Sequence, residues 1–530
     1  MATSELVRPA AEARSLRVRG ITATLLATIM IGAALPRYLN LRESLWLDEL
    51  HTAWVVAGSW SEISARARIG NQSPWYFYLV RLVVEACGMS EFSLRLPSLI
   101  AGLLLVPLAW RIAGRWGQSL AAAAMVAALV AVDRWCVYYA QEARSYALVQ
   151  LISLFQIACF ARLLDRCEIR WRIGCIGLTS LMFYLHYTSV ILIAGEAAAY
   201  LFICAADRGS LSYRPRQAVI DAGLCVAAAV PAIPHLAYIA QHRANWAQMV
   251  AKPGFAGLFT LFPVAAYSIP TLAALVLDRV GGAASDGPEG NGPAKRQVFT
   301  HAAILCLCWL VVPLSATWML TRLDIARLFM VRYLIGIVVA PMMLGGVLLA
   351  AVRRGTIRIA AASIVLVLAA YHGGLLSKLA QSGVLPGERN QDWRGAVAEI
   401  QRDATTSDWP VLVRSGFMEA DELRRSQDPL LQSYCLAPVS SLYRLDSPGR
   451  TLIPLPVTDA GRLTRQSREK LRHNRGAWVL IYGAAKSRAS IERDLRASLQ
   501  QVALRTVRVR LATYGNILLL KLRFEPDKQH

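Results

Sequence analysis

The sequence predicts an α-helical polytopic membrane protein with a small α/β domain at its C-terminal end. Of the 530 residues, 55% are hydrophobic. Apolar stretches of about 20 residues, the length that crosses a bilayer, recur through the first 380 positions. Arginines gather in the short loops between these stretches, as orientation signals do. After Gly383 the composition changes, and short β-rich runs alternate with helical patterns.

The formal net charge of +22 raises the question of a nucleic-acid partner. No compact basic domain and no nucleic-acid motif accompanies this charge. We therefore predict that the chain binds the lipid bilayer and does not bind nucleic acid.

The N-terminus, residues 1–19, is predicted to be cytoplasmic. Arg8, Arg14, Arg17 and Arg19 precede the apolar run Ile21–Leu35, and no convincing small-residue cleavage site follows it. We expect an uncleaved first span and about eleven spans in all. The predicted spans are 20–38, 95–113, 118–133, 146–164, 172–186, 188–206, 217–239, 256–279, 299–320, 333–352 and 357–379.

This count gives each loop a side of the membrane. The basic loops 111–115, 165–172, 207–216, 280–297 and 353–358 then face the cytoplasm, as expected for arginine-rich loops of the inner membrane. The loops 39–73, 134–145, 240–255 and 321–332 face outward. We predict a transmembrane domain over 20–380, with 39–73 as its first outer loop, and an extracytoplasmic domain over 384–530.

The segment Pro74–Cys87 is apolar but too short for a span and contains Arg81 and Glu85. We predict that it forms a helix on the outer surface of the membrane.

The C-terminal domain is predicted to contain four strands and two helices. Only Cys435 lies in this polar part, so no disulfide forms within it, and no Cys/His metal spacing appears. Its basic surface suits anionic lipid headgroups, and a solvated surface without a ligand is an equal alternative. The predicted strands are Pro410–Val413, Ala477–Tyr482, Val502–Leu511 and Asn516–Leu522, and the helices are Trp393–Arg402 and Ser487–Leu499.

An adjacent acid pair, Asp48 and Glu49, lies just beyond the first span. Two neighbouring carboxylates raise each other's pKa, and one of them can serve as a general base. An ordinary solvated pair is the alternative. The predicted topology places Glu142 on the same face of the membrane as Asp48.

The chain resembles the bacterial family 39 glycosyltransferases, a group similar to protein O-mannosyltransferases and to the aminoarabinose transferases of lipid A. The resemblance covers most of the chain and rests on the order and spacing of several segments. These are Glu43–His51, Asn71–Tyr78, Glu91–Ser98, Tyr138–Leu148, His186–Thr188, Arg332–Leu334 and Asp392–Arg394.

The resemblance implies a C-type glycosyltransferase fold and a polyprenyl-phosphate sugar donor. It also implies transfer to a protein, lipid or glycan acceptor at the outer face of the membrane. A sugar linked to phosphate already carries a leaving group, so one base and a cationic clamp suffice for a single inverting displacement.

The family pattern assigns roles to the acids. Asp48 matches the first-loop acid and becomes the base that takes the acceptor proton, and Glu49 orients the acceptor or the loop. Glu142 is expected as a second acid that contacts the acceptor or a cation. A carboxylate that complements a helix dipole is an equally good interpretation of Glu142 alone.

Arg144 and Arg332 are the candidates for the donor phosphate, because a guanidinium grips two oxygens at once. Arginines that only orient helices are the alternative. Tyr333 is expected to donate to the same phosphate, and an aromatic-belt role is its alternative. The other candidate substrate-binding residues are Tyr139, His186 and Gln72.

Two of these residues need a comment. His186 is expected to bind the sugar or a metal, and a structurally satisfied histidine is its alternative. Gln72 stands about where the aminoarabinose transferases carry a lysine, so a lipid A substrate is less expected. No cofactor is firmly implied, although Glu142 and His186 are compatible with a divalent cation.

A transporter or flippase of lipid-linked sugars is the rival function. Transporters often contain internal repeats and carry acids near the bilayer midplane. The sequence shows no convincing repeat, and its candidate acids lie in outer loops. A non-enzymatic scaffold is a third interpretation, which the joint presence of the acids and arginines disfavours.

Overall fold

The computed structural model describes residues 4–206, 211–242, 250–280, 293–373, 389–445, 449–457, 469, 471, 474–483, 493, 497 and 504–526. The chain divides into two compact units. The first, which we call the helical unit, comprises Met1–Asn40, Ser98–Pro234 and Ala247–Gly387. The second, the α/β unit, comprises Leu41–Pro97, His235–Trp246 and Glu388–His530.

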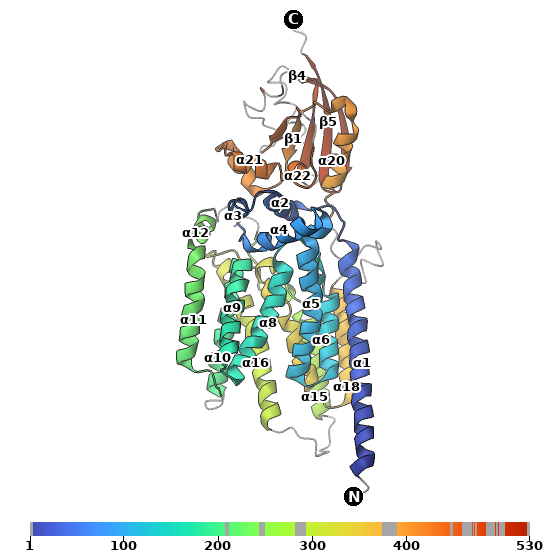
Figure 1. The fold of residues 1–530 in the computed structure, drawn as a ribbon, viewed down its shortest axis with the longest axis vertical. Coiled ribbons are helices and arrows are strands. Elements are labelled where there is room, and N and C mark those ends of the chain that lie inside the picture. The colour runs from blue at the N-terminus through green and yellow to red at the C-terminus, as the bar shows by residue number, and fades with distance from the viewer. Residues whose placement is uncertain are drawn as a thin grey trace. The chain divides into compact units, whose positions relative to one another are not determined.

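The helical unit is built from long apolar helices, drawn from blue to yellow in Figure 1. They are α1 (Ser4–Leu39), most of α5 (Glu91–Gly117), α6 (Leu120–Val132), α7 (Arg134–Ala140), α8 (Tyr146–Asp165), α9 (Ile169–Leu185), α10 (Leu192–Ala206), α11 (Pro215–Ala229), α14 (Gly257–Thr260), α15 (Val264–Val280), α16 (Pro293–Arg322), α17 (Ala340–Ala350) and α18 (Gly355–His372). Short 3₁₀ turns connect some of them; they are η1 (Tyr187–Ile191), η2 (Val230–Ala232), η3 (Val331–Tyr333) and η4 (Ile335–Ile337). The helix α12 (Ile233–Gln241) follows η2, and most of it belongs to the α/β unit.

Seven helical segments in the described part of the chain are long and apolar enough to cross a membrane. The bent pair α6–α7, with an angle of 55° between its two parts, makes an eighth if it is one span. The predicted count was about eleven. Each predicted segment does contain a helix, but α9 and α15 have 17 residues each and α17 has 11, which is short of the usual spanning length.

Glycines let several of these helices approach closely. A Cβ atom on Gly195 of α10 would lie 2.8 Å from the carbonyl oxygen of Cys308 on α16. One on Gly345 of α17 would lie 3.0 Å from the carbonyl oxygen of Tyr267 on α15. Small residues at such contacts favour helix association where lipid removes the hydrophobic driving force.

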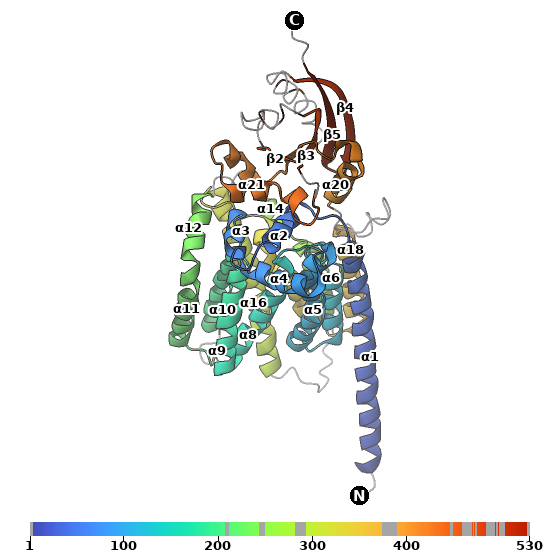
Figure 2. The ribbon, with the colours of Figure 1, turned by 45° about the horizontal axis from the view of Figure 1, so that its top comes forward.

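The α/β unit contains a five-stranded sheet, visible with α20 beside β4 and β5 in Figure 2. Its strand order is β2-β1-β3-β5-β4. Strands β2, β1 and β3 are parallel, and β5 runs antiparallel to β3 and to β4. The strands are β1 (Val411–Arg414), β2 (Leu452–Pro454), β3 (Gly476–Tyr482), β4 (Leu504–Tyr514) and β5 (Ile517–Pro526).

The same unit contains short helices before and within the C-terminal part. They are α2 (Leu47–Ala57), α3 (Ile63–Ile69), α4 (Trp75–Cys87), α20 (Trp393–Arg402), α21 (Pro429–Cys435) and α22 (Ala437–Ser440), with the 3₁₀ turns η5 (Ala404–Thr406) and η6 (Met418–Arg424).

The structure confirms the predicted fold class, and the helix Trp393–Arg402 has its predicted bounds. A strand lies in each of the four predicted strand segments. The predicted helix Ser487–Leu499 lies almost wholly outside the described residues. At Pro74–Cys87 the chain forms α4, whose 13 residues extend about 20 Å and are too few to span the membrane.

The first outer loop folds with the C-terminal part of the chain rather than with the spanning helices. Residues 41–97 and 388–530 belong to the same compact unit. Its position in the sequence predicts that this loop belongs to the transmembrane domain, because a local sequence pattern carries no signal for contacts with residues more than 300 positions away.

Candidate active site

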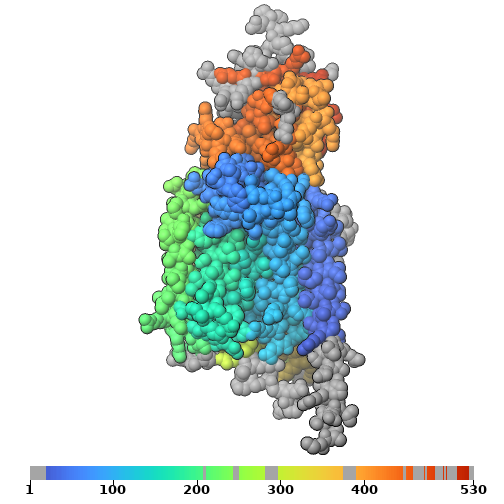
Figure 3. All heavy atoms as spheres, viewed as in Figure 1, coloured from blue at the N-terminus to red at the C-terminus, as the bar shows by residue number. Residues whose placement is uncertain are grey.

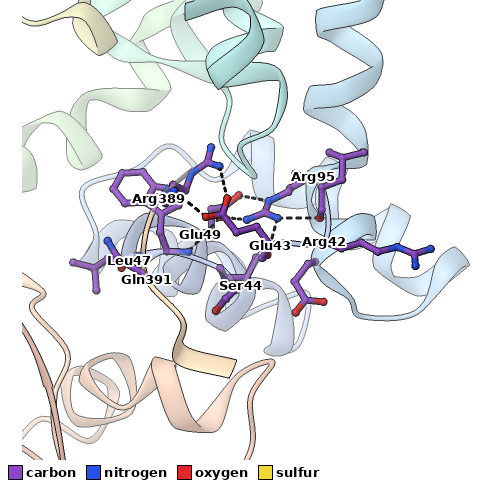
Figure 4. Close-up of polar contacts among 12 residues, drawn as sticks. Arg42, Glu43, Ser44, Leu47, Glu49, Arg95, Arg389 and Gln391 are labelled. Carbon is purple, nitrogen blue, oxygen red and sulfur yellow. Dashed lines mark hydrogen bonds and ion pairs between the residues drawn. The ribbon is translucent and has the colours of Figure 1, made fainter. Parts of the chain in front are cut away.

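The acid pair lies in the first turn of α2. Glu49 and Arg95 form an ion pair in which neither side chain has any exposed area. Arg95 donates from Nε to Oε1 of Glu49 at 2.7 Å and from Nη2 to Oε2 at 2.5 Å (Figure 4). The amide of Trp46 also donates to Oε2, at 3.3 Å. Glu49 is therefore held in one orientation by a two-pronged contact.

Arg95 also fixes the chain that precedes the acid pair. Its Nη1 donates to the carbonyl oxygens of Leu41, at 2.9 Å, and of Glu43, at 2.8 Å. A single guanidinium thus joins the start of the loop and the start of α2 to the N-terminal part of α5. The neighbouring Asp48 is half-buried in the same first helical turn, where the helix dipole favours a negative charge.

Residues from the C-terminal part hold the same loop from another side. The amide of Arg389 donates to Oε1 of Glu43 at 2.8 Å, and Oε1 of Gln391 accepts from the amide of Leu47 at 3.1 Å (Figure 4). Farther along, the hydroxyl of Tyr443 accepts from the amide of Leu45 at 2.8 Å. The position of the acid pair therefore depends on side chains from both parts of the α/β unit.

A second carboxyl near Asp48 comes from η6, the turn that follows β1. Glu419 is 5% exposed. Its Oε2 accepts from the hydroxyl of Tyr434 at 3.4 Å, and its Oε1 has no hydrogen-bond partner among the described residues. Burial, followed by the negative charges of Glu422 and Asp48, raises the pKa of Glu419 to about 7.

Tyr482 lies at the same edge of the sheet, at the end of β3. Nε2 of Gln391 donates to its hydroxyl at 3.4 Å. Burial and the charge of Asp48 raise the pKa of Tyr482. Glu419 and Tyr482 thus follow the carboxyl ends of parallel strands, where ligands commonly bind in α/β sheets. We did not select Glu419 from the sequence because it lies in no recognised motif, although its place just after a predicted strand was an available signal.

The rings around Tyr434 connect Glu419 to α2. The ring centroid of Tyr434 lies 5.3 Å from that of His51 and 5.3 Å from that of Trp54. Tyr434 also stacks on Phe417 at 4.2 Å. His51 is three residues after Asp48 on the same helix, so the packing of Tyr434 ties the position of Glu419 to that of the acid pair.

The helical unit contains a second group of predicted site residues. The bend between α6 and α7 is capped by Asp133, whose Oδ1 accepts from the amides of Trp135 and Cys136 at 2.9 and 3.0 Å. The loop after α7 carries Glu142 and Arg144, which are 1% and 5% exposed. Charged side chains in loops are rarely buried to this extent.

An aromatic row leads from this loop to η3. Ring centroids are separated by 4.8 Å between Tyr139 and Tyr146, by 5.5 Å between Tyr146 and His186, and by 6.2 Å between His186 and Tyr333. Cζ of Arg332 lies 5.4 Å from the ring centroid of Tyr333. The structure therefore brings these four predicted residues, Tyr139, His186, Arg332 and Tyr333, into one row.

His186 lies where α9 ends, and its environment is well defined. Its Nδ1 is 2.7 Å from Oγ1 of Thr188, and that hydroxyl also donates to the carbonyl oxygen of Tyr333 at 3.3 Å. The charges of Arg144 and Arg332 both act on His186. Two guanidinium groups in reach of one imidazole make this region of the helical unit suited to an anion.

The predicted residues thus form two groups. Asp48, Glu49 and Gln72 belong to the α/β unit, with Gln72 half-buried between α3 and α4. The other six belong to the helical unit; they are Tyr139, Glu142, Arg144, His186, Arg332 and Tyr333.

No group of three or more His, Cys, Asp or Glu side chains that could hold a metal occurs among the described residues. Glu142 and His186 alone do not make a cation site of the usual ligand number.

Residues 71–238 match the family model described as dolichyl-phosphate-mannose-protein mannosyltransferase. No curated protein sequence matches the chain. Among solved structures, the chain is similar to ArnT from Cupriavidus metallidurans bound to undecaprenyl phosphate, with a TM-score of 0.54 and 12% identity over 95% of this chain and 98% of that one. The apo state of the same ArnT and the apo oligosaccharyltransferase of Archaeoglobus fulgidus match with TM-scores of 0.42 at 11% identity, covering 95% and 94% of this chain and 98% and 88% of theirs.

The family match and the first structural match support each other. Together they confirm the predicted resemblance to family 39 and the C-type glycosyltransferase fold.

Proposed function

We propose that this chain transfers a sugar from a polyprenyl-phosphate donor to an acceptor hydroxyl at the outer face of the inner membrane. The observation that carries the proposal is the first-loop acid pair, which the buried contact between Glu49 and Arg95 holds in place in a C-type glycosyltransferase fold. The match to a structure described as bound to undecaprenyl phosphate supports a polyprenyl-phosphate donor. The cytoplasmic N-terminus and the extracytoplasmic α/β unit follow from the charges of the loops.

In the proposed reaction, Asp48 acts as the general base. Its carboxylate takes the proton of the acceptor hydroxyl while the acceptor oxygen attacks C1 of the sugar. The bond between C1 and the phosphate oxygen breaks in the same step, and the configuration at C1 inverts. The leaving group is polyprenyl phosphate, so no second carboxyl acid is needed to protonate it.

Glu49 has a positioning role in this proposal. Both of its carboxylate oxygens accept from Arg95, which leaves the half-buried Asp48 as the better placed base of the pair. A base must be held in reach of the proton that it removes, and the buried ion pair fixes the first turn of α2 for this purpose.

Arg144 and Arg332 stabilise the phosphate charge that develops as the donor bond breaks, and the hydroxyl of Tyr333 donates to the same group. Two guanidinium groups are well suited to this charge because each can grip two oxygens. In this proposal, four further residues hydrogen-bond the sugar or the acceptor; they are Glu142, Tyr139, His186 and Gln72. The transferred sugar is a hexose or a pentose, and the glutamine at position 72 argues against lipid A as the acceptor.

The first test uses the purified full chain in lipid and a panel of radiolabelled polyprenyl-phosphate sugars. Loss of donor is measured for the wild type, for Asp48→Asn and for Asp408→Asn, a control at an exposed acid of the same unit. The proposal requires consumption of at least one donor by the wild type and the control, with a loss of about 100-fold or more in Asp48→Asn. Movement of intact donor across the bilayer without any consumption would instead establish a transporter.

A further inference from the structure

A cavity of about 460 Å³ lies within the helical unit, between α8, α9, α10 and α11. These are the segments drawn in teal and green in Figure 1 and Figure 3. Apart from α9, they belong to segments long enough to span the membrane. Several apolar residues of its wall are largely exposed, including Leu201, Val219 and Val226 at 66%, 72% and 67%. In spanning segments such exposed apolar side chains face the hydrocarbon of the bilayer, so this wall of the cavity borders on lipid.

Among the polar side chains that line this apolar cavity, three have an unsatisfied buried atom. Oε1 of Gln156 on α8, Oγ of Ser180 on α9 and Oε1 of Glu196 on α10 are buried and have no hydrogen-bond partner among the described residues. We call these three residues the polar triad. An unpartnered polar group costs several kcal/mol in a hydrocarbon environment. Three such atoms from three helices around one cavity indicate a ligand that satisfies them.

Nε2 of Gln156 donates to Oγ1 of Thr179 at 3.2 Å, so the amide oxygen is the atom of this side chain that is left without a partner among the described residues. Glu196 and Gln156 are 8% and 1% exposed, so bulk water does not cover them. An ionisable residue within a membrane span is rare and usually functional.

The position of Glu196 defines the depth of the ligand's polar group. In the segment Tyr187–Ala206, Glu196 lies about 14 Å from either end along the helix. This is near the middle of the hydrocarbon core, where the ester groups of ordinary phospholipids do not lie. The ligand therefore carries its polar group deep in the membrane.

The hydrogen-bonding chemistry of the polar triad limits which polar group the ligand can carry. The amide oxygen of Gln156 can only accept, so the ligand must donate a hydrogen bond. An alkyl chain and an ester both fail this requirement, whereas a hydroxyl donates and accepts. Toward α11 the cavity is closed by Asp221, which is neutralised by Arg172 through contacts of 2.5 and 3.0 Å and accepts from Tyr213 at 3.0 Å. Among the described residues that line this end of the cavity, none is an uncompensated acid that would attract a cation.

We propose that this cavity binds a lipid alcohol from the bilayer, with its apolar body against α10 and α11 and its hydroxyl within the polar triad. This site is separate from the proposed transfer reaction, and its test does not depend on that reaction.

The test measures binding of tritiated hexadecan-1-ol to the full chain in nanodiscs. Unlabelled hexadecane, methyl hexadecanoate and hexadecylamine compete in parallel samples. We expect saturable binding of the alcohol that neither hexadecane nor the ester displaces. If unlabelled hexadecane displaces the tritiated alcohol as effectively as unlabelled alcohol does, the cavity binds only alkyl chains, and the proposal is overturned. Tighter binding of the amine, abolished in Glu196→Gln, would identify an ammonium site and would also overturn it.

Variants localise the binding. Ser180→Ala and Gln156→Leu are each expected to weaken binding about threefold to tenfold, the usual effect of one lost hydrogen bond. Glu196→Gln keeps a donor and an acceptor and should bind within about twofold of the wild type. The matched control is Ser268→Ala on α15, because Oγ of Ser268 is also buried without a partner among the described residues but does not line the cavity. Equal binding by the wild type and all triad variants would refute the site.

Discussion

Glu49 and Arg95 meet in a fully buried, two-pronged ion pair, with nitrogen–oxygen distances of 2.7 and 2.5 Å, although 46 positions separate them in the sequence. The pair connects the first turn of α2 with the second turn of α5. Removal of one partner from a buried pair leaves an uncompensated charge, whereas removal of both does not. The fold of the acid-pair loop therefore depends on the two residues being present together.

The first prediction concerns this pair. Arg95→Met is expected to lower the free energy of unfolding by about 3–5 kcal/mol, because it leaves the carboxylate of Glu49 buried without its partner. The double variant Glu49→Leu, Arg95→Met should recover most of the loss. Denaturant unfolding of the three proteins in detergent measures the effect. Glu62→Gln, which disrupts an exposed pair with Arg66, is the control and should change little. A double variant no more stable than Arg95→Met would contradict the predicted coupling.

The second prediction concerns the proposed base. Asp48→Asn should lower kcat about 100-fold or more while the affinity for the donor stays within about twofold, since only proton removal is affected. Asp48→Glu should retain more activity than Asp48→Asn, because the carboxylate remains. Initial rates at saturating donor, together with equilibrium binding of the donor, separate the two quantities. Normal kcat in Asp48→Asn would remove Asp48 from the reaction.

The third prediction concerns Arg144 and Arg332. Alanine at either position should weaken binding of a polyprenyl-phosphate analogue about tenfold or more, through loss of a charge-assisted contact to phosphate. Lysine at either position should restore part of the affinity, because it keeps the charge but not the two-pronged geometry. The control is Arg134→Ala, an exposed arginine that packs over Trp135. If the control weakens binding as much as the other two variants, the effect is a general one of charge.

The fourth prediction concerns stability and pH. The pKa of Glu419 rises from 4.5 to about 7 in the folded protein, owing to burial and then to the charges of Glu422 and Asp48, and Tyr434 opposes the rise by a hydrogen bond. Between these two values the folded state binds more protons than the unfolded state, so stability falls as the pH rises. This group alone lowers the free energy of unfolding by about 3 kcal/mol from pH 4.5 to above pH 7.

Thermal unfolding at pH 5 and pH 8 measures this slope. Glu419→Gln should remove most of it, because the neutral side chain no longer titrates. Glu422→Gln should reduce it, because one of the charges that raise the pKa of Glu419 is lost. An unchanged slope in Glu419→Gln would show that other groups are responsible for the pH dependence.

Local patterns in the sequence were sufficient to predict the helices and most strands. In α20 the buried residues Trp393, Ala396, Val397 and Ile400 follow helical spacing, and the bounds of the helix were predicted correctly. Long apolar runs predicted the positions of the apolar helices in the same way, but they overstated the number of segments long enough to span a membrane. Each of these signals lies within about 25 consecutive residues, which is why the sequence alone reveals it.

Contacts between distant residues could not be predicted in this way. The family motifs contain both Glu49 and Arg95, but no local rule pairs them. Gln391 holds the amide of Leu47 and Tyr443 holds that of Leu45 from about 350 to 400 positions away. Glu419 lies in no motif, and only the folded sheet brings it near Asp48. Some residues of the candidate site could therefore be predicted from the sequence. The hydrogen bonds that hold the acid-pair loop, and the second carboxyl group, Glu419, could not.

Two long-range hydrogen bonds have a consequence for biosynthesis. They join the amide of Leu45 to Tyr443 and the amide of Leu47 to Gln391. The ribosome completes the acid-pair loop before it has made either partner, which lie 398 and 344 residues later. Until the last part of the chain emerges from the ribosome and folds, these amides lack their native acceptors, and α2 lacks the packing that fixes its start. The acid-pair loop therefore reaches its final fold only after the C-terminal part has been made, so a nascent or truncated chain is expected to form the apolar helices without the fixed start of α2.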